Sequence, residues 1–286
     1  MKPIVRWTIG DKCSPLGFTI LREAIINFTN IYKQSFDYYV QYNFNSFDNM
    51  HKEEKLRDTV KDLNVNLRKQ SWTESPIDIN KPESKVFSSV DNLKDSGSIW
   101  KVCPPRFNLD THEIVMDNDL VIYKKIPEID DFLSVNDKLL VLEDPIKYYG
   151  AYVGSNLDNS KVLNSGLFGL YPGYKFGDNL KYFWLNNGRF PKLSYSDEQG
   201  FICAVLRKDP NVMISKTTIV EMHFRGICKF YKPNVTSDDF FLPYNQEIFN
   251  EFYNHGCGIH FVQSNTKNAH GAWEYFKKKR ANKLFV

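Results

Sequence analysis

Two aspartates stand one residue apart at the end of an apolar run in the middle of the chain. The run Glu113–Met116 leads into Asp117-Asn118-Asp119. Because residues two apart in a strand point to the same side, both carboxylates would lie at one edge of a sheet. Like charges this close repel unless a cation lies between them, and carboxylate oxygens suit Mg²⁺ or Mn²⁺. The spacing therefore indicates a divalent-metal site, with a strand-to-helix turn capped by Asp117 or Asp119 as the alternative.

The elements around this motif alternate from the first residues. Strand-like runs and amphipathic helical patterns follow one another as far as residue 70, which the spacing of apolar residues indicates. We expect a strand at Ile4–Ile9, a loop at Gly10–Gly17, a helix at 18–33, a strand at 36–43, a helix at 51–63 and a strand at 65–70. This order predicts an α/β protein with a parallel, doubly wound sheet, and such sheets bind ligands at their carboxyl edge.

The rest of the chain continues this pattern after one polar interruption. Residues Ser71–Ser98 are polar and rich in turn formers, which indicates a loop or a flexible lid. Further strands are expected at 138–144, 166–172, 217–224 and 258–264, and helices at 197–207 and 271–280.

Composition is that of a folded protein in a reducing compartment. The 286 residues are 42% hydrophobic, and the net charge of +3 neither indicates nor excludes a polyanionic partner. The five cysteines are widely spaced without a Cys-x-x-Cys pair, which disfavours a disulfide framework or a zinc site. There is no signal-peptide pattern and no apolar run of about 20 residues. We therefore expect a cytoplasmic protein, in the host cytoplasm if the source is viral.

Five stretches, taken in order, resemble those of the GT-A glycosyltransferases, above all the glycogenin-like and bacterial galactosyltransferase group. They are Trp7–Gly10, the stretch MDNDLVI around the two aspartates, Leu163–Leu170, Ser196–Phe201 and Gly258–Trp273. The resemblance implies a single GT-A domain over residues 1–286, with a Rossmann-like, mostly parallel sheet and helices on both faces. Residues 1–110 would form the nucleotide-binding half, with a mobile loop at 71–98. Residues 111–286 would form the half for metal, donor sugar and acceptor.

The metal ligands follow from the aspartates and from this resemblance. Asp117 and Asp119 would hold Mn²⁺, or Mg²⁺, against the diphosphate of a nucleotide sugar, and a histidine from the late motif would be a third ligand. The family ends this motif as His-Phe-x-Gly-x-x-Lys-Pro-Trp, whereas here the spacing is longer and the Lys-Pro-Trp is absent. We expect His260 as the ligand because it lies in a strand-like stretch, with His270 as the second choice.

The remaining candidates would bind or act on the donor. A leaving diphosphate gains negative charge, which cationic side chains stabilise, and the sugar needs polar or acidic groups on its other side. The expected catalytic residues are Asp197, Glu198 and Gln199, although the acids also suit the dipole at a helix start. The expected donor-binding residues are Thr8, Ile9, Gly10, Lys101, Arg106, Asn118, Asn164, Ser165, Gly166 and Lys267. For the three cations among them, an ordinary surface charge is the alternative.

The resulting hypothesis is a glycosyltransferase that moves a sugar from a nucleotide-diphosphate sugar, such as a UDP-sugar, with retention of configuration. The basic end, Lys277–Lys283, is either a solvated helix or a contact for phosphate or an anionic surface. Because the composition suits an AT-rich genome, hydroxymethylated cytosine in bacteriophage DNA is one candidate acceptor, and a glycan or lipopolysaccharide is the other. Two rival functions are a HAD-like phosphatase with Asp117 as nucleophile, and a sugar- or nucleotide-binding module without catalysis.

Overall fold

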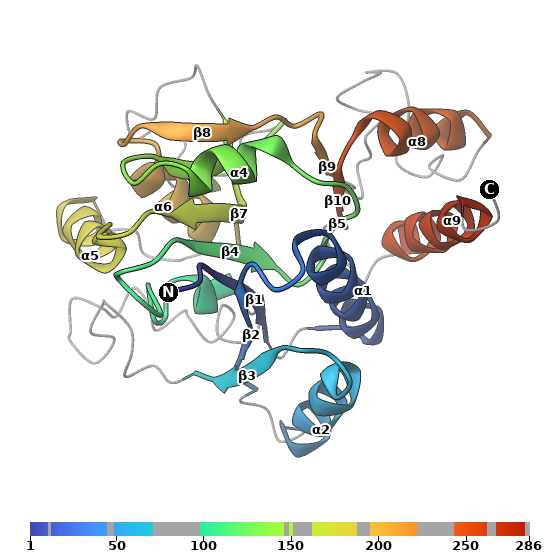
Figure 1. Cartoon of the computed structure of the whole chain (residues 1–286), viewed down its shortest axis with the longest axis horizontal. Coiled ribbons are helices and arrows are strands. Elements are labelled where there is room, and N and C mark those ends of the chain that lie inside the picture. Colours follow the sequence, from blue (N-terminus) through green and yellow to red (C-terminus); the bar gives the residue numbers. More distant parts are fainter. Residues whose placement is uncertain are drawn as a thin grey trace.

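A seven-stranded sheet with helices on both faces forms the body of the protein (Figure 1). The computed structural model describes residues 1–10, 13–44, 49–70, 98–145, 149–150, 162–187, 195–221, 243–261 and 267–283. Across the sheet the strands run in the order β3 (Asn66–Lys69), β2 (Asp37–Tyr42), β1 (Ile4–Ile9), β4 (Glu113–Asp117), β7 (Leu163–Leu170), β6 (Leu139–Glu143) and β8 (Asn211–Ile214). This arrangement confirms the predicted α/β class with a mostly parallel sheet.

Strand directions bring several strand ends to one edge of this sheet. β1 is parallel to β2 and β4, and β2 is parallel to β3. β7 runs antiparallel to both of its neighbours, β4 and β6, and β6 is parallel to β8. The carboxyl ends of β1, β4 and β6 therefore meet the beginning of β7. In this register Thr8 pairs with Asp117, and Leu142 pairs with Asn164.

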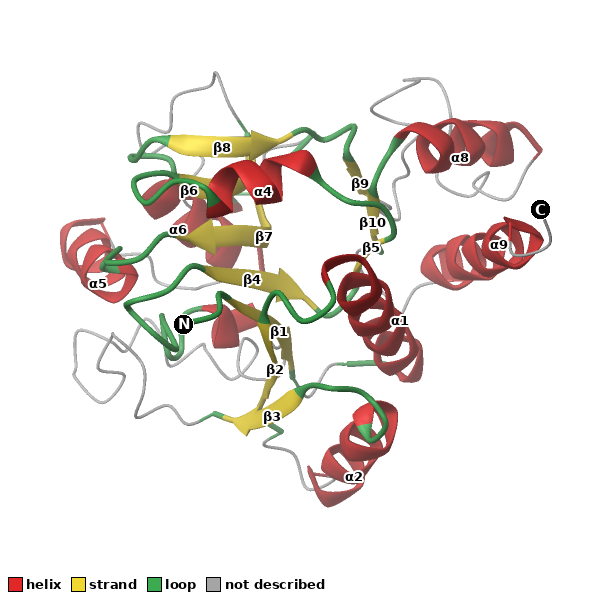
Figure 2. Ribbon diagram, in the orientation of Figure 1, coloured by secondary structure: helices red, strands yellow, loops and turns green. Residues whose placement is uncertain are grey.

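Alternate residues of the strands face two separate hydrophobic cores. Helices α1 (Pro15–Tyr32), α2 (Asn49–Val60) and α4 (Pro127–Leu133) pack on one face. The other face is covered by the 3₁₀ helix η3 (Ser98–Lys101) and by α5 (Phe176–Asn187) and α6 (Tyr195–Leu206). Figure 2 shows α6 behind the sheet, on the side opposite α4. On β4, Ile114 and Met116 belong to the first core and Val115 to the second. The near-continuous apolar run of this strand is thus explained by burial on both faces.

Helix α1 begins earlier than the apolar pattern indicated. Its N-cap is Ser14, whose hydroxyl accepts a hydrogen bond from the backbone N–H of Gly17 at 3.0 Å. Pro15 follows in the first turn, where a backbone N–H is not needed for the helix. The expected loop at Gly10–Gly17 is therefore shorter, because local capping rather than apolar spacing sets the helix start.

A smaller, three-stranded sheet continues the chain beyond the two aspartates. β4 ends at Asp117, Asn118 and Asp119 form a turn, and β5 (Leu120–Ile122) then pairs antiparallel with β10 (Gly258–His260). β9 (Ile219–Glu221) pairs parallel with β10. The helices α8 (Pro243–His255) and α9 (Lys267–Lys283) contribute to the core beside this sheet (Figure 1). The aspartates therefore do not share one strand, and the helix-cap alternative is wrong because a strand follows the turn.

Most expected segments overlap an element of the predicted type. This holds for the strands expected at 4–9, 36–43, 65–70, 138–144, 166–172, 217–224 and 258–264 and for the helices expected at 18–33, 51–63, 197–207 and 271–280. No pattern in the sequence indicated α4, α5, β8 or α8. The predicted lid at Ser71–Ser98 lies outside the described residues except for its last residue, and the division into two halves stays a prediction.

Within the described ranges, no helix has the length and apolar character that crossing a membrane requires.

Candidate metal and donor site

Asp117, Asp119 and His260 meet at the junction of the two sheets. Asp117 is the last residue of β4, Asp119 lies in the turn before β5, and His260 ends β10 opposite Leu120. His260 Nε2 lies 3.2 Å from Asp119 Oδ1 and 3.6 Å from Asp117 Oδ2. One ligand atom from each of the three residues lies within 4.8 Å of the other two. The pairing of β5 with β10 thus joins groups that are far apart in the sequence.

The histidine in this cluster is His260 and not His270. His260 is buried, whereas the side chain of His270 is exposed on α9. A glycine of β7 provides the space for the imidazole. A Cβ at Gly166 would lie 2.5 Å from His260 Cε1 and 2.7 Å from Asn164 Oδ1. Gly166 therefore lets β7 approach the cluster closely, a reason for glycine that is independent of any donor contact.

The cluster has ligand types that suit a divalent cation, and it is open enough for further ligands to reach such an ion. Two carboxylates and an imidazole are ligands that Mn²⁺ accepts. The Asp117 and Asp119 side chains remain 22% and 16% exposed, so further ligands can reach an ion held there. Burial alone would lower the pKa of His260, but the hydrogen bond and charge of Asp119, together with Asp117, raise this pKa to about 9. A proton thus supplies the positive charge that the two aspartates require when no cation is bound.

Lys101 places a buried positive charge beside the aspartates. It ends η3, only 2% of its surface is exposed, and its Nζ lies 2.8 Å from Asp117 Oδ1. The same nitrogen lies 3.4 Å from Glu198 Oε1 and 3.2 Å from Ser165 Oγ. Burial opposes the charged form, yet the carboxylates of Asp117 and Glu198 raise the pKa of Lys101 above its ordinary value. These two carboxylates therefore favour the charged form of the amine at the site.

Helix α6 brings Glu198 and Gln199 to the same place. Glu198 is buried, and burial raises its pKa to about 7 although the charge of Lys101 opposes this shift. Near neutral pH its carboxyl group can therefore both donate and accept a hydrogen bond. Gln199 Nε2 donates to Asp144 Oδ2 at 2.9 Å. The third expected catalytic residue, Asp197, lies in α6, and its side chain is outside the described residues.

Asp144 is a residue of this site that the sequence analysis missed. It follows β6 at the same edge, and its Oδ2 accepts hydrogen bonds from Asn164 Nδ2 at 3.0 Å and from Gln199 Nε2. Asn164 Oδ1 in turn accepts the backbone N–H of Gly166 at 2.6 Å. The sequence contained a signal, because Asp144 ends the apolar run LLVLED much as Asp117 ends its own run.

Glu221 is a second acid that the sequence analysis missed. It ends β9 and pairs in register with His260 of β10. Burial and the carboxylate of Asp144 raise the pKa of Glu221, while the positive charge of His260 opposes this effect. Its strand was expected, but no motif distinguished this glutamate, because its importance comes from strand pairing.

Arg106 was expected to bind the donor, but its guanidinium contacts backbone carbonyls of the protein. Its Nη atoms donate to four backbone carbonyls, those of Asn108, Thr111, Tyr171 and Tyr174. Its Nε lies 3.5 Å from Glu113 Oε2. Glu113 begins β4 and Asp117 ends it, a separation of about 13 Å at roughly 3.3 Å per residue. The guanidinium of Arg106 therefore has its partners at the far edge of the sheet, and its donor contact stays a prediction that these partners do not support.

Three expected donor residues lie where β1 ends. Thr8 is buried beside Asp117 in register. The Ile9 side chain is fully buried in the core, so a ligand at this edge can meet only its backbone. Gly10 is also buried, and its carbonyl accepts a hydrogen bond from the N–H of Cys13 at 3.0 Å.

Two further donor candidates are placed only in part. Asn118 lies in the turn between the aspartates, and its Nδ2 is 3.7 Å from Cys13 Sγ. Lys267 begins α9, with its side chain outside the described residues.

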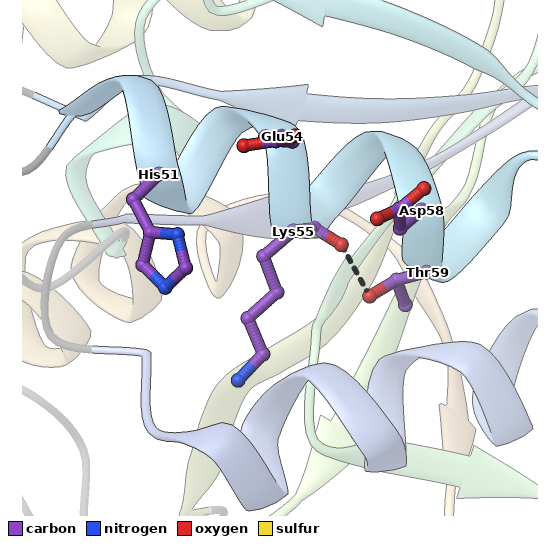
Figure 3. A pocket seen from close by; sticks show the side chains of 5 residues that line it. All are labelled: His51, Glu54, Lys55, Asp58 and Thr59. Carbon is purple, nitrogen blue, oxygen red and sulfur yellow. Dashed lines mark hydrogen bonds between the residues drawn. The ribbon is translucent and has the colours of Figure 1, made fainter.

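A surface groove runs along α2, on the side that faces α1 (Figure 3). It has a cavity volume of about 570 Å³ and is lined by His51, Glu54, Lys55, Asp58 and Thr59. The Lys55 side chain extends across it, with Nζ 5.3 Å from the centre of the Phe18 ring. The lining carries charges of both signs and none of the expected metal or donor residues. The candidate site is therefore at the sheet edge and not in this groove.

Comparisons with known proteins agree with this architecture. No protein-family model and no curated protein matches the sequence. Among solved structures, the galactosyltransferase LgtC in complex with donor and acceptor sugar analogues gives a TM-score of 0.54 at 10% identity, over 96% of this chain and 94% of that one.

Two further solved structures are also glycosyltransferases. The apo form of mouse xyloside xylosyltransferase 1 gives a TM-score of 0.50 at 11% identity, over 93% of this chain and 98% of that one. The apo form of GlyE from Streptococcus pneumoniae gives 0.52 at 10% identity, over 96% and 59%. The fold of the chain is therefore the GT-A fold of glycosyltransferases, as its motifs predicted.

Proposed function

We propose that this protein is a metal-dependent glycosyltransferase that uses a nucleotide-diphosphate sugar as donor. The observation that carries the proposal is the meeting of Asp117, Asp119 and His260 at the carboxyl edge of a sheet with this fold. These ligands suit a cation that also binds phosphate oxygens. When bound, the cation would offset the negative charge that develops on the leaving diphosphate.

The chain's own residues would bind and orient the donor around that cation. The Lys101 amine, already charged and fixed beside Asp117, would face phosphate oxygens in a buried setting where charge is most effective. The carboxylate of Asp144 and the amides of Asn164 and Gln199 form a connected hydrogen-bonding group next to it. Such groups match sugar hydroxyls, which both donate and accept. Glu198, with a pKa of about 7, can hold a proton between the two regions.

We infer Mn²⁺ as the resident metal and retention of the anomeric configuration as the outcome. The imidazole of His260 supports Mn²⁺ over Mg²⁺, because Mg²⁺ prefers oxygen ligands alone. Retention rests on the resemblance of Leu163–Leu170 and Ser196–Phe201 to elements around the sugar in retaining enzymes. An NMR spectrum of the product tests this inference, and an inverted linkage would contradict it.

The acceptor proposal depends on the basic C-terminal helix. Hydroxymethylated cytosine in bacteriophage DNA and a glycan or lipopolysaccharide are the two acceptor classes that we consider. In the structure, Lys277 pairs with Glu274 at 2.7 Å, and Arg280 pairs with Glu23 of α1. Two of the four consecutive basic residues thus have acidic partners within the protein. Their support for a polyanionic acceptor is weaker than the sequence alone indicated.

A thermal-shift screen of nucleotide sugars with and without Mn²⁺ tests the proposed function. The double substitution of Asp117→Asn and Asp119→Asn should abolish donor stabilisation that depends on metal, while the protein remains folded. Asp110→Asn, at an exposed loop position, is the matched control and should retain this stabilisation. Full turnover in excess chelator would contradict the proposal. Stabilisation without turnover would favour the non-catalytic module, and an aspartyl-phosphate trapped at Asp117 would favour the phosphatase.

A further inference from the structure

An arginine in the middle of the sheet is enclosed by the protein interior. Arg6 of β1 is fully buried, and its Nε lies 2.8 Å from Glu113 Oε1 on the neighbouring strand β4. The Phe107 ring covers the guanidinium at 4.9 Å. A buried ion pair is weak support for stability, since the desolvation of both charges offsets their attraction. The ion pair alone therefore does not explain why an arginine is buried here, and its hydrogen bonds indicate another role.

The guanidinium holds the backbone of the segment that starts at the end of η3. Nη1 and Nη2 donate to three carbonyls at 2.9 to 3.0 Å, those of Lys101, Pro104 and Pro105. Gln41 of β2 extends this clamp. Its Oε1 accepts from Arg6 Nη1 at 2.7 Å, and its Nε2 donates to the carbonyl of Cys103 at 2.7 Å. Two side chains of the central strands thus satisfy carbonyl groups that regular secondary structure does not pair.

The first residue of the clamped segment carries the buried amine of the candidate site. The carbonyl of Lys101 is bonded to Arg6, while its side chain reaches Asp117 and Glu198. The clamp thus holds the backbone from which the buried Lys101 side chain extends. We propose that Arg6 and Gln41 are positioning residues that hold Lys101 against Asp117 and Glu198. The role of that lysine towards a donor rests on the proposed function, whereas its position can be measured independently.

Conservative substitutions separate the clamp from the ion pair. Arg6→Lys keeps a positive charge for Glu113 but loses the planar fork that binds several carbonyls at once. Gln41→Leu removes the amide at similar volume without changing any charge. Ile25→Ala, at a fully buried position of α1 in the other core, is the control for a loss of stability unrelated to the clamp.

Chemical labelling of lysines reports the position of Lys101 without a substrate. The protein is treated with a small amine-acylating reagent, and the modified lysines are quantified by mass spectrometry against the exposed Lys278. Arg6→Lys and Gln41→Leu should each label Lys101 about tenfold faster or more than Ile25→Ala does, because lost hydrogen bonds increase local opening. In transferase assays, Gln41→Leu should have no further effect once Lys101→Met is present, since it acts through that lysine.

The labelling result tests the positioning role of Arg6 and Gln41 independently of any transferase activity. Labelling of Lys101 in Arg6→Lys and Gln41→Leu at the rate of the Ile25→Ala control would overturn the positioning role. Fast labelling in both variants, combined with a wild-type protein that transfers no sugar, would support the positioning role and contradict the proposed function. An effect of Gln41→Leu that adds fully to that of Lys101→Met would also overturn the proposal.

Discussion

Replacing Glu198 with glutamine should remove a cost to folding that grows with pH. Burial raises the pKa of this carboxyl group from 4.5 to about 7, against the opposing charge of Lys101. The folded state therefore binds the proton more tightly than the unfolded state. Its relative stability is greatest below pH 4.5 and falls as pH rises towards 7. At about 1.4 kcal/mol per pH unit between the two pKa values, the cost reaches roughly 3 kcal/mol.

Urea denaturation in the presence of chelator measures this effect. The free energy of unfolding of Glu198→Gln, relative to wild type, should increase by roughly 2.5 kcal/mol between about pH 5 and about pH 8. Lys101 keeps its partner Asp117 at 2.8 Å in the variant, so the loss of one carboxylate adds an offset without this pH dependence. Glu251→Gln, at an exposed position of α8, is the matched substitution. A difference that stays constant over this pH range would refute the reasoning.

Three further predictions concern the cluster and the basic helix. With a pKa of about 9, His260 is protonated at about pH 7.5 and must lose its proton to bind a metal. Calorimetry of Mn²⁺ binding in buffers of different ionisation enthalpy should therefore show release of close to one proton, and no release would contradict this protonation. Gly166→Ala would place a Cβ 2.5 Å from His260 Cε1 and should weaken Mn²⁺ binding about tenfold or more without unfolding the protein. Unchanged affinity would show that β7 can shift to accommodate the methyl group. If DNA is the acceptor, replacing Lys278 and Lys279 with glutamine should reduce the salt dependence of binding by about 0.9 log units per lost phosphate contact. An unchanged slope would mean that these charges are only solvated.

The sequence by itself determined the layout of the first half and identified the two aspartates of the candidate metal cluster. The spacing of apolar residues indicates which side chains are buried and hence whether a segment is a helix or a strand. The elements β1, α1, β2, α2 and β3 were therefore predicted in the correct order. Asp117 and Asp119 were found because two carboxylates one residue apart need compensation wherever they are placed. Elements such as α5 and β8 were missed because their boundaries depend on the partners they pack against, which the local sequence does not show.

Only the tertiary structure decided which distant groups join the aspartates. His260 was separated from His270 by the pairing of β10 with β5. Lys101 and Arg106 flank the same Cys-Pro-Pro stretch, yet one amine reaches Asp117 while the guanidinium binds carbonyls near the start of β4. Local sequence could not distinguish such cases, because a charged side chain takes its role from the partners that burial imposes. Those partners come from strands brought together by long-range pairing, which no local periodicity encodes.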